Sequence, residues 1–256
     1  MQIQYGSQTS LGRVRTSNED SLVANTETGL ALVADGMGGH AAGEVASQLA
    51  ASTINEWVTA HDAASEDAAE MLRLGALEAN SRVFEAQRND RSLAGMGSTL
   101  TALLFRGDRY YIAHVGDSRA YRMRDGVLEQ LTRDHSLVWH LYENGVLEKS
   151  DLAKHPQKNL ITRSIGSHSQ VEIDIEEGVG RAGDVYLLCS DGLTDGVTEE
   201  GLCKVLSDPD ETPQEIANGL VEAANQAGGS DNITVVVIRL VAQDTTIRVS
   251  GKSRQQ

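Results

Sequence analysis

The chain has 256 residues, 40% of them hydrophobic, with three prolines, two cysteines and a formal net charge of −15. This acidity argues against nucleic acid or anionic membranes as partners, and two cysteines are too few for a disulfide framework, so core packing is expected for both. No apolar run approaches the roughly 20 residues of a membrane span, and the N-terminus lacks a secretory signal. We expect a cytoplasmic protein with one domain over residues 1–241 and a polar tail over 242–256.

Short apolar or alternating runs predict strands, and turn sequences such as Arg106-Gly107-Asp108 between them favour antiparallel hairpins. Apolar residues recur at helical spacing from Ala46 to Trp57, from about Ser65 to Arg88, and from Pro213 to Gln226, where Thr212 is a plausible cap. Strands in clusters with helices between them predict an α+β fold of antiparallel sheets covered by helices. The expected strands are Ile3–Ser7, Ser21–Asn25, Gly29–Ala34, Ser98–Phe105, Tyr110–Val115, Ala120–Arg124, Val171–Glu176, Val185–Cys189 and Ile233–Val241.

Between Asp134 and Asn159 the pattern loosens into short helical pieces that carry Trp139 and His140. The segment could be an ordinary connection, but loops of this length inside compact domains are often functional lids. Trp57 and Trp139 are expected to pack rather than to bind a ligand.

Acidic residues adjoin the ends of several predicted strands, each beside a small or turn-forming residue. One such carboxylate is normally a turn acceptor, but several brought together would repel one another unless a cation neutralised them. Oxygen ligands without a cysteine or histidine pair predict Mg²⁺ or Mn²⁺, and this number of carboxylates favours two ions. Glycines 36, 38 and 39 would let the backbone turn sharply and bring a carbonyl close to an ion. The acids are Glu19, Asp20, Asp35, Asp117, Asp191 and Asp231.

Eight segments in order resemble the metal-dependent serine/threonine protein phosphatases of type 2C (the PPM family) in their compact bacterial form. The resemblance covers about residues 4–240. It implies a four-layer αββα sandwich, in which two central, mainly antiparallel β-sheets are flanked by helix pairs, with a flap over about residues 134–159. The matching segments are "GRVRTSNED", "VADGMGGHAAGE", "GSTLTALL", "AHVGDSRAY", "LTRDHS", "ITRSIG", "LLCSDGLTD" and "GGSDNITVVVI".

The resemblance also implies a set of metal ligands. Asp35 matches the carboxylate that bridges two catalytic Mg²⁺ or Mn²⁺ ions. Asp191 and Asp231 match further ligands of one ion, while Glu19 and the carbonyl of Gly36 match ligands of the other.

Four more residues match the family's site. Asp20 corresponds to an acid that holds metal-bound water, and Asp117 to a residue that binds a third, weaker ion together with Asp191. Arg15 corresponds to the guanidinium that grips the substrate phosphate, and His40 to the proposed general acid. Outside the motifs, Arg15 could instead pair with a surface acid, and His40 could cap or pack against a helix.

The function implied is hydrolysis of phosphoserine and phosphothreonine in proteins by a metal-activated water, in opposition to a bacterial serine/threonine kinase, with the flap gating access. We expect a monomer whose partners are phosphorylated proteins and such a kinase. Two alternatives stay open: a catalytically inactive module that binds phosphoproteins, and a two-metal phosphohydrolase of small molecules.

Four other polar residues stand out in the sequence. His114 follows apolar residues and is expected to be a hydrogen-bonded core histidine, while surface positions are favoured for His135 and His140. Arg163 lies in a family motif, but its sequence context gives it no chemical role.

Overall fold

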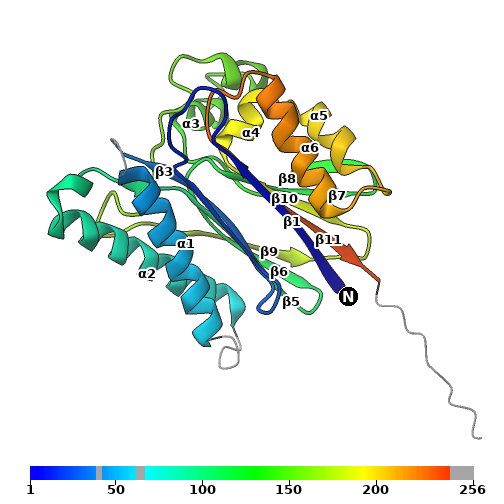
Figure 1. Ribbon diagram of the computed structural model, residues 1–256, viewed down its shortest axis with the longest axis horizontal. Helices are drawn as coiled ribbons and strands as arrows, with labels where there is room; N and C mark the ends of the chain where they lie inside the picture. The colour runs from blue at the N-terminus through cyan, green and yellow to red at the C-terminus, as the bar shows by residue number, and fades with distance from the viewer. Residues whose placement is uncertain (39–41, 62–66, 243–256) are drawn as a thin grey trace, which may run out of the picture.

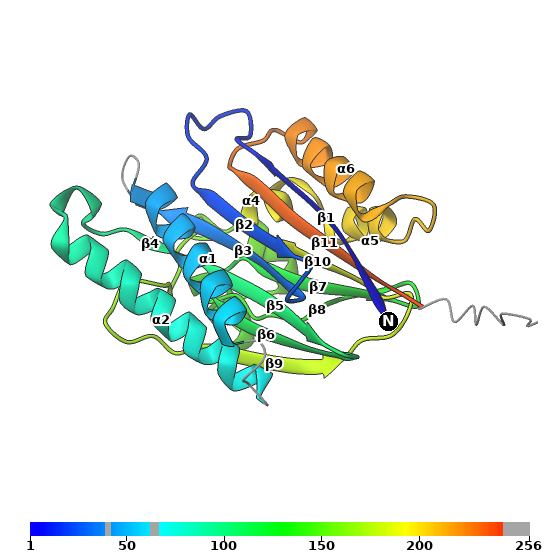
Figure 2. The same cartoon turned by 60° about the horizontal axis from the view of Figure 1, so that its bottom comes forward.

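The computed structural model describes residues 1–38, 42–61 and 67–242. Two antiparallel sheets pack face to face, and helices cover the outer face of each (Figure 1), which is the four-layer αββα sandwich expected. Figure 2 shows that the strands of both sheets lie along roughly the same axis between the two helix layers. His40, Gly39 and almost all of the expected tail lie outside the described residues.

Every strand pair in the two sheets is antiparallel. The five-stranded sheet has the order β1-β11-β10-β7-β8, and the six-stranded sheet has the order β2-β3-β5-β6-β9 with β4 paired to β3. The strands are β1 (Gln2–Ser10), β2 (Asp20–Asn25), β3 (Leu30–Met37), β4 (Gly97–Ser98), β5 (Leu100–Arg106), β6 (Arg109–Val115), β7 (Arg119–Arg124), β8 (Val127–Gln130), β9 (Asp174–Val179), β10 (Val185–Cys189) and β11 (Ile233–Val241).

Helices α1 (Ala42–His61) and α2 (Ala68–Asn89) cover the six-stranded sheet. Their buried faces are rich in alanine, so the helices can approach the sheet closely. On the other side lie α4 (Asp191–Gly196), α5 (Glu199–Leu206) and α6 (Pro213–Gln226). The bounds of α6 are those predicted, with Thr212 and Glu215 forming a capping box. The remaining helices are α3 (Leu137–Glu143), η1 (Arg91–Leu93) and η2 (Lys149–Lys154).

Three apolar clusters form the core, one between the sheets and one under each helix layer. Between the sheets, the ring of Tyr186 meets the edges of Phe105 and Tyr110 at centroid distances of 5.3 and 5.4 Å. Both cysteines pack in or against the cluster under α4–α6, as expected. Trp57 packs partly buried against the cluster under α1 and α2, also as expected.

Four elements differ from the predictions. Strand β8 and helices α4 and α5 were missed, and β9 begins three residues after the Val171 start that was expected. Val171 and Ile173 still pack on the core, so their apolar character does not mark where the strand begins. No helix in the described part of the chain is long and apolar enough to cross a membrane.

Candidate metal centre

The predicted acidic residues lie at one end of the two sheets. Asp20, the first residue of β2, pairs in register with Asp35 near the end of β3. Asp117 follows β6, Asp191 begins α4 directly after β10, and Asp231 precedes β11. The sheet order therefore brings together side chains that are far apart in the sequence.

These carboxylates raise one another's pKa values. Burial, followed by the charge of Asp231, raises the pKa of Asp20 to about 6, while burial and the charge of Asp134 raise that of Asp117 to about 7. Burial also holds the pKa values of Asp35 and Asp191 well above their usual range, with further contributions from neighbouring aspartates. A site that disfavours several negative charges at once is suited to a cation.

Two carboxylate oxygens in this cluster have no hydrogen-bond partner. Oδ1 of Asp20 and Oδ1 of Asp191 are buried and unpaired among the described residues. An unpaired buried acceptor is costly, and a divalent ion would satisfy it. The donor set, all oxygen, fits Mg²⁺ or Mn²⁺.

Glycine residues make room for two more predicted ligands. A Cβ atom on Gly43 would lie 2.3 Å from Oε2 of Glu19 and 3.0 Å from the carbonyl oxygen of Gly36, so both oxygens border the same space. The expected role of Gly36 in a sharp turn was wrong: Gly36 lies in β3 and pairs with Ser98. Its Cβ would come within 2.0 Å of the Gly43 carbonyl oxygen, so close packing requires glycine there.

The side chains do not yet form a closed ligand set. Among the described histidines, cysteines and acids, no group of three has its donors arranged around one point. Two of the predicted site acids have other partners: Arg15 Nη2 lies 2.6 Å from Oδ2 of the predicted ligand Asp231, and Ser190 Oγ donates to Asp20 Oδ2 at 2.8 Å. Oδ2 of Asp231 therefore already has a cationic partner at the open side of the cluster.

Arg15 lies at the open side of the cluster, with its side chain 51% exposed. Its hydrogen bond to Asp231 raises its pKa, and the charges of Glu19 and Asp35 add to this. Arg15 thus forms an ion pair, but with a predicted metal ligand rather than with an unrelated surface acid, and its role toward phosphate stays a prediction.

Asn232 was not predicted as a site residue, yet it holds the loop that carries Glu19. Its Oδ1 accepts from the Glu19 backbone N–H at 2.8 Å, and its Nδ2 donates to the carbonyl oxygens of Leu11 and Ser17 at 3.1 and 3.0 Å. The sequence signal was the polar Ser-Asp-Asn run before the long apolar strand β11.

Comparison with known proteins agrees with this geometry. Residues 8–220 match the family model described as protein phosphatase 2C. The chain belongs to the protein phosphatase 2C family. It is 42% identical to the serine/threonine protein phosphatase PstP of Mycobacterium tuberculosis over 94% of the chain, but it spans only 46% of that relative's length.

Two further comparisons, with one more relative and with one solved domain, cover nearly the whole of both chains. The serine/threonine phosphatase stp of Listeria monocytogenes is 39% identical over 90% of this chain and 93% of its own. The solved catalytic domain of PstP, in complex with two manganese ions, superposes with a TM-score of 0.84 at 40% identity and covers 94% of this chain and 99% of its own.

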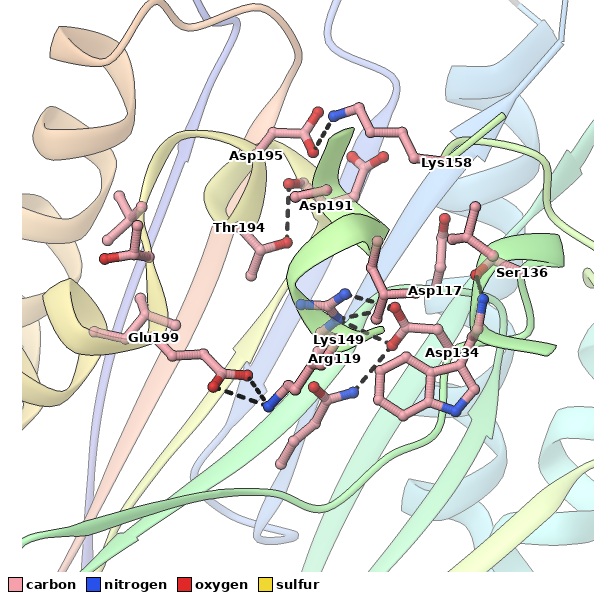
Figure 3. Close-up of a pocket in the computed structure, with 18 of the residues that line it drawn as sticks. Asp117, Arg119, Asp134, Ser136, Lys149, Lys158, Asp191, Thr194, Asp195 and Glu199 are labelled. Atoms are coloured by element: carbon pink, nitrogen blue, oxygen red, sulfur yellow. Dashed lines mark hydrogen bonds and ion pairs between the residues drawn. The ribbon is translucent and has the colours of Figure 1, made fainter. Parts of the chain in front are cut away.

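A cavity of about 590 Å³ adjoins the acidic cluster in this family member. Asp117 and Asp191 form part of its lining, and the rest comes largely from the segment 134–159 and from α4 and α5 (Figure 3). Two ion pairs join these walls: Lys149 Nζ lies 2.8 Å from Glu199 Oε1, and Lys158 Nζ lies 2.5 Å from Asp195 Oδ1.

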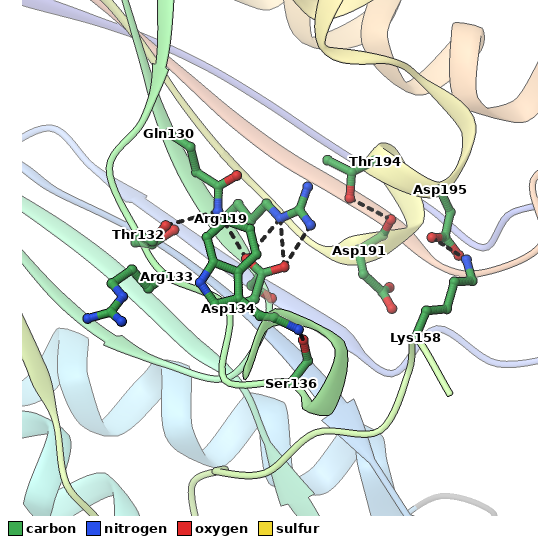
Figure 4. A network of polar contacts seen from close by, with 12 residues as sticks. Arg119, Gln130, Thr132, Arg133, Asp134, Ser136, Lys158, Asp191, Thr194 and Asp195 are labelled. Atoms are coloured by element: carbon green, nitrogen blue, oxygen red, sulfur yellow. Dashed lines mark hydrogen bonds and ion pairs between the residues drawn. The ribbon is translucent and has the colours of Figure 1, made fainter. Parts of the chain in front are cut away.

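A buried ion pair connects the start of the segment 134–159 to the strand after Asp117. The Asp134 carboxylate accepts from Arg119 Nε at 2.9 Å and Nη2 at 2.6 Å, and from Gln130 Nε2 at 3.0 Å (Figure 4). This pair was not predicted, because Arg119 and Asp134 lie fifteen residues apart and become neighbours only in the folded chain.

The other histidines divide as follows. His114 is buried with both ring nitrogens hydrogen-bonded, to Thr101 Oγ1 at 3.0 Å and to the Arg133 carbonyl oxygen at 2.9 Å, as predicted. His140 is exposed, also as favoured. The surface position favoured for His135 was wrong, because His135 is only 8% exposed and is hydrogen-bonded on both sides of its ring.

Proposed function

We propose that this chain hydrolyses phosphoserine and phosphothreonine in proteins at a binuclear Mg²⁺ or Mn²⁺ centre. The observation that carries the proposal is the convergence of buried, mutually repelling carboxylates, two of which have unpaired oxygens, at one end of the sandwich. The two manganese ions of the PstP catalytic domain and the names of the relatives support the same reading.

In this proposal Asp35 would be shared by the two ions, and Asp191 and Asp231 would be further ligands of one. Glu19 and the carbonyl of Gly36 would hold the other, in the space beside Gly43. When bound, the ions would act as Lewis acids that activate water for attack and neutralise charge on the phosphate. Asp117 and Asp191 would hold a third, weaker ion.

Arg15 exchanges partners during substrate binding. An exposed ion pair contributes only about 0–1 kcal/mol, so little free energy opposes release of Asp231 by Arg15. The freed guanidinium would then bind two phosphate oxygens with its planar fork of donors. Asp20 would orient water beside the phosphorus, while His40 would protonate the departing serine or threonine oxygen.

A cysteine-dependent mechanism is disfavoured by the state of the thiols. Burial raises the pKa of Cys189 to about 12, so this residue stays protonated at neutral pH and is a poor nucleophile. The other thiol, of Cys203, packs against the apolar cluster under α6.

The wider proposal is a monomeric, cytoplasmic enzyme with one catalytic domain over residues 1–241, acting on targets of a serine/threonine kinase. This proposal also includes a flap over residues 134–159 that gates access to the site. The cavity between the flap and helices α4 and α5 supports that role.

A phosphate-release assay tests the function. Mn²⁺-dependent release from a phosphothreonine peptide is expected for the wild type and not for the Asp35→Ala and Asp231→Ala variants. Release from nucleotides alone would favour a small-molecule phosphohydrolase. Tight binding of the phosphopeptide without turnover, at saturating Mn²⁺, would favour an inactive binding module.

A further inference from the structure

The flap is closed at its base by backbone pairing. The Leu137 N–H donates to the Leu160 carbonyl at 2.9 Å, the Thr162 N–H donates to the His135 carbonyl at 2.8 Å, and Ser136 forms a bridge with Ile161. His135 is therefore the residue at which the chain enters this base.

His135 is also bonded to the turn that presents Asp117. The Gly116 N–H donates to His135 Nδ1 at 3.0 Å, and the His135 N–H donates to the Gly116 carbonyl at 2.7 Å. Gly116 has a φ of +110°, and a Cβ there would lie 2.6 Å from Cβ of Thr99. A single flap-base residue thus satisfies both backbone groups of a glycine whose conformation few other residues can adopt.

The same bonds determine the tautomer of His135. His135 Nε2 lies 3.1 Å from both Asp174 Oδ2 and Arg163 Nη1. Because Nδ1 accepts from the Gly116 N–H, the proton of the neutral ring must be on Nε2, so Nε2 donates to Asp174 and does not accept from Arg163. Arg163 Nη1 donates to the other oxygen of Asp174 at 2.5 Å. Asp174, at the start of β9, therefore fixes the orientation of the imidazole from the side opposite Gly116.

From the turn, hydrogen bonds continue to the central acid of the cluster. Thr99 Oγ1 lies 2.7 Å from Ser118 Oγ and accepts from the Asp35 N–H at 2.8 Å, while the Thr99 N–H donates to the Asp35 carbonyl at 2.8 Å. The path from the flap base through the Gly116 turn to Asp35 is contiguous.

We infer that His135 is a positioning residue of the proposed metal centre: by accepting the Gly116 N–H it fixes the turn that aims Asp117, and it joins the flap base to that turn. The inference rests on the proposed function. His135 acts through the backbone and does not touch the substrate. A histidine that merely fills space would be replaceable by any side chain of equal volume.

Two substitutions separate these roles. His135→Phe keeps the ring but loses the acceptor, whereas His135→Asn keeps an acceptor close to the position of Nδ1. By calorimetric Mn²⁺ titration, we expect the affinity of the weakest ion to fall about tenfold or more in His135→Phe, in line with losses of partners behind metal ligands. It should stay within roughly threefold of wild type in His135→Asn.

Hydrogen exchange at the Gly116 amide reports the same contact without metal. Its protection should be lost in His135→Phe and kept in His135→Asn. The matched control is His140→Phe, which changes an exposed histidine of the same segment and should alter neither readout. If His135→Phe does not fold, Asp174→Asn, at a half-exposed position, should still weaken Mn²⁺ binding in the same direction.

Equal Mn²⁺ affinity in wild type and His135→Phe, or an Nδ1–H tautomer of His135 in ¹⁵N-edited NMR spectra, would overturn the inference. So would a wild type that binds no Mn²⁺. A wild type that binds Mn²⁺ but releases no phosphate from phosphopeptides would overturn the proposed function alone, because neither the titration nor the exchange measurement depends on turnover.

Discussion

Strand β10 has an aspartate beyond each of its ends, and the two carboxylates differ in their hydrogen bonds and in the direction of their pKa shifts. Asp184, before the strand, accepts from Arg124 Nε at 2.7 Å, from Arg124 Nη2 at 2.6 Å and from the Arg181 N–H at 2.7 Å. These contacts hold its pKa below the usual range despite burial. Asp191, after the strand, has an unpaired oxygen and a pKa well above that range, because burial and other aspartates act on it. The protein can satisfy a buried carboxylate, so the unpaired oxygen of Asp191 fits a role in binding a cation.

The substitution Asp191→Asn is the strongest test of the difference between the two aspartates. We expect activity to fall at least about 10³-fold, because a metal ion contributes several kcal/mol to the reaction and each 1.4 kcal/mol is tenfold. Without metal, however, the variant should be about 1 kcal/mol more stable than wild type, since a repelled charge is removed. Urea unfolding in EDTA measures this, and a destabilised metal-free variant would contradict the reading of the cluster.

At the other end of β10, Asp184→Ala should leave activity unchanged and reduce stability by about 3 kcal/mol. The cause is that Arg124 and the Arg181 N–H lose their buried partner. Glu177→Ala removes one partner of an exposed ion pair with Arg109 and should cost no more than about 0.5 kcal/mol. If the two variants had equal unfolding midpoints, the contrast between buried and exposed pairs would be wrong.

His114 shows the effect of burial on a basic group, which is buried in its neutral form. Burial lowers its pKa from the ordinary 6.5 to about 3, so the unfolded chain takes up a proton before the folded one. This contribution to stability is complete above about pH 6.5 and is lost as the pH falls towards 3. Between pH 7 and pH 5 the loss should be about 2 kcal/mol, at 1.36 kcal/mol per pKa unit. Unfolding free energies of wild type and His114→Gln, measured at both pH values, should show a smaller decrease in the variant.

The smallest effect on activity is expected for Arg15→Lys. A lysine keeps the charge but lacks the two-pronged geometry, so KM for a phosphopeptide should rise about tenfold with a smaller change in kcat. Arg13→Lys, two residues away, is the matched control, because Arg13 Nε donates to the Asn225 carbonyl rather than to an acid. An unchanged KM in Arg15→Lys would remove Arg15 from the substrate site.

The sequence predicts helices and strands best where the apolar periodicity extends over several turns or residues. The α6 boundaries follow from nearly four turns of apolar spacing and a capping box, whereas α4, only six residues with glycine at two of them, has no periodicity to detect. Strand β8 is a partly exposed edge strand of four residues, so it carries no apolar alternation strong enough to predict.

The residues of the candidate site also differ in whether the local sequence could predict them. Asp35 and Asp191 could be recognised because each follows an apolar run and precedes glycine. Asp134 and His135 could not, because their partners Arg119 and Gly116 become neighbours only after β6, β7 and the flap base have folded together. A polar residue whose meaning depends on a contact across the fold leaves no local signal.

Gly43 lies in the first turn of α1, where the space beside it is bounded by Glu19 and the Gly36 carbonyl. Replacing helical glycines by alanine is a common way to raise thermal stability and would ordinarily gain up to about 1 kcal/mol. At this position the added methyl would fill the volume that the proposed ion needs. A variant designed for higher thermal stability should therefore keep Gly43 and change solvent-facing positions such as Gly219, where nothing lies within 4 Å of an added Cβ.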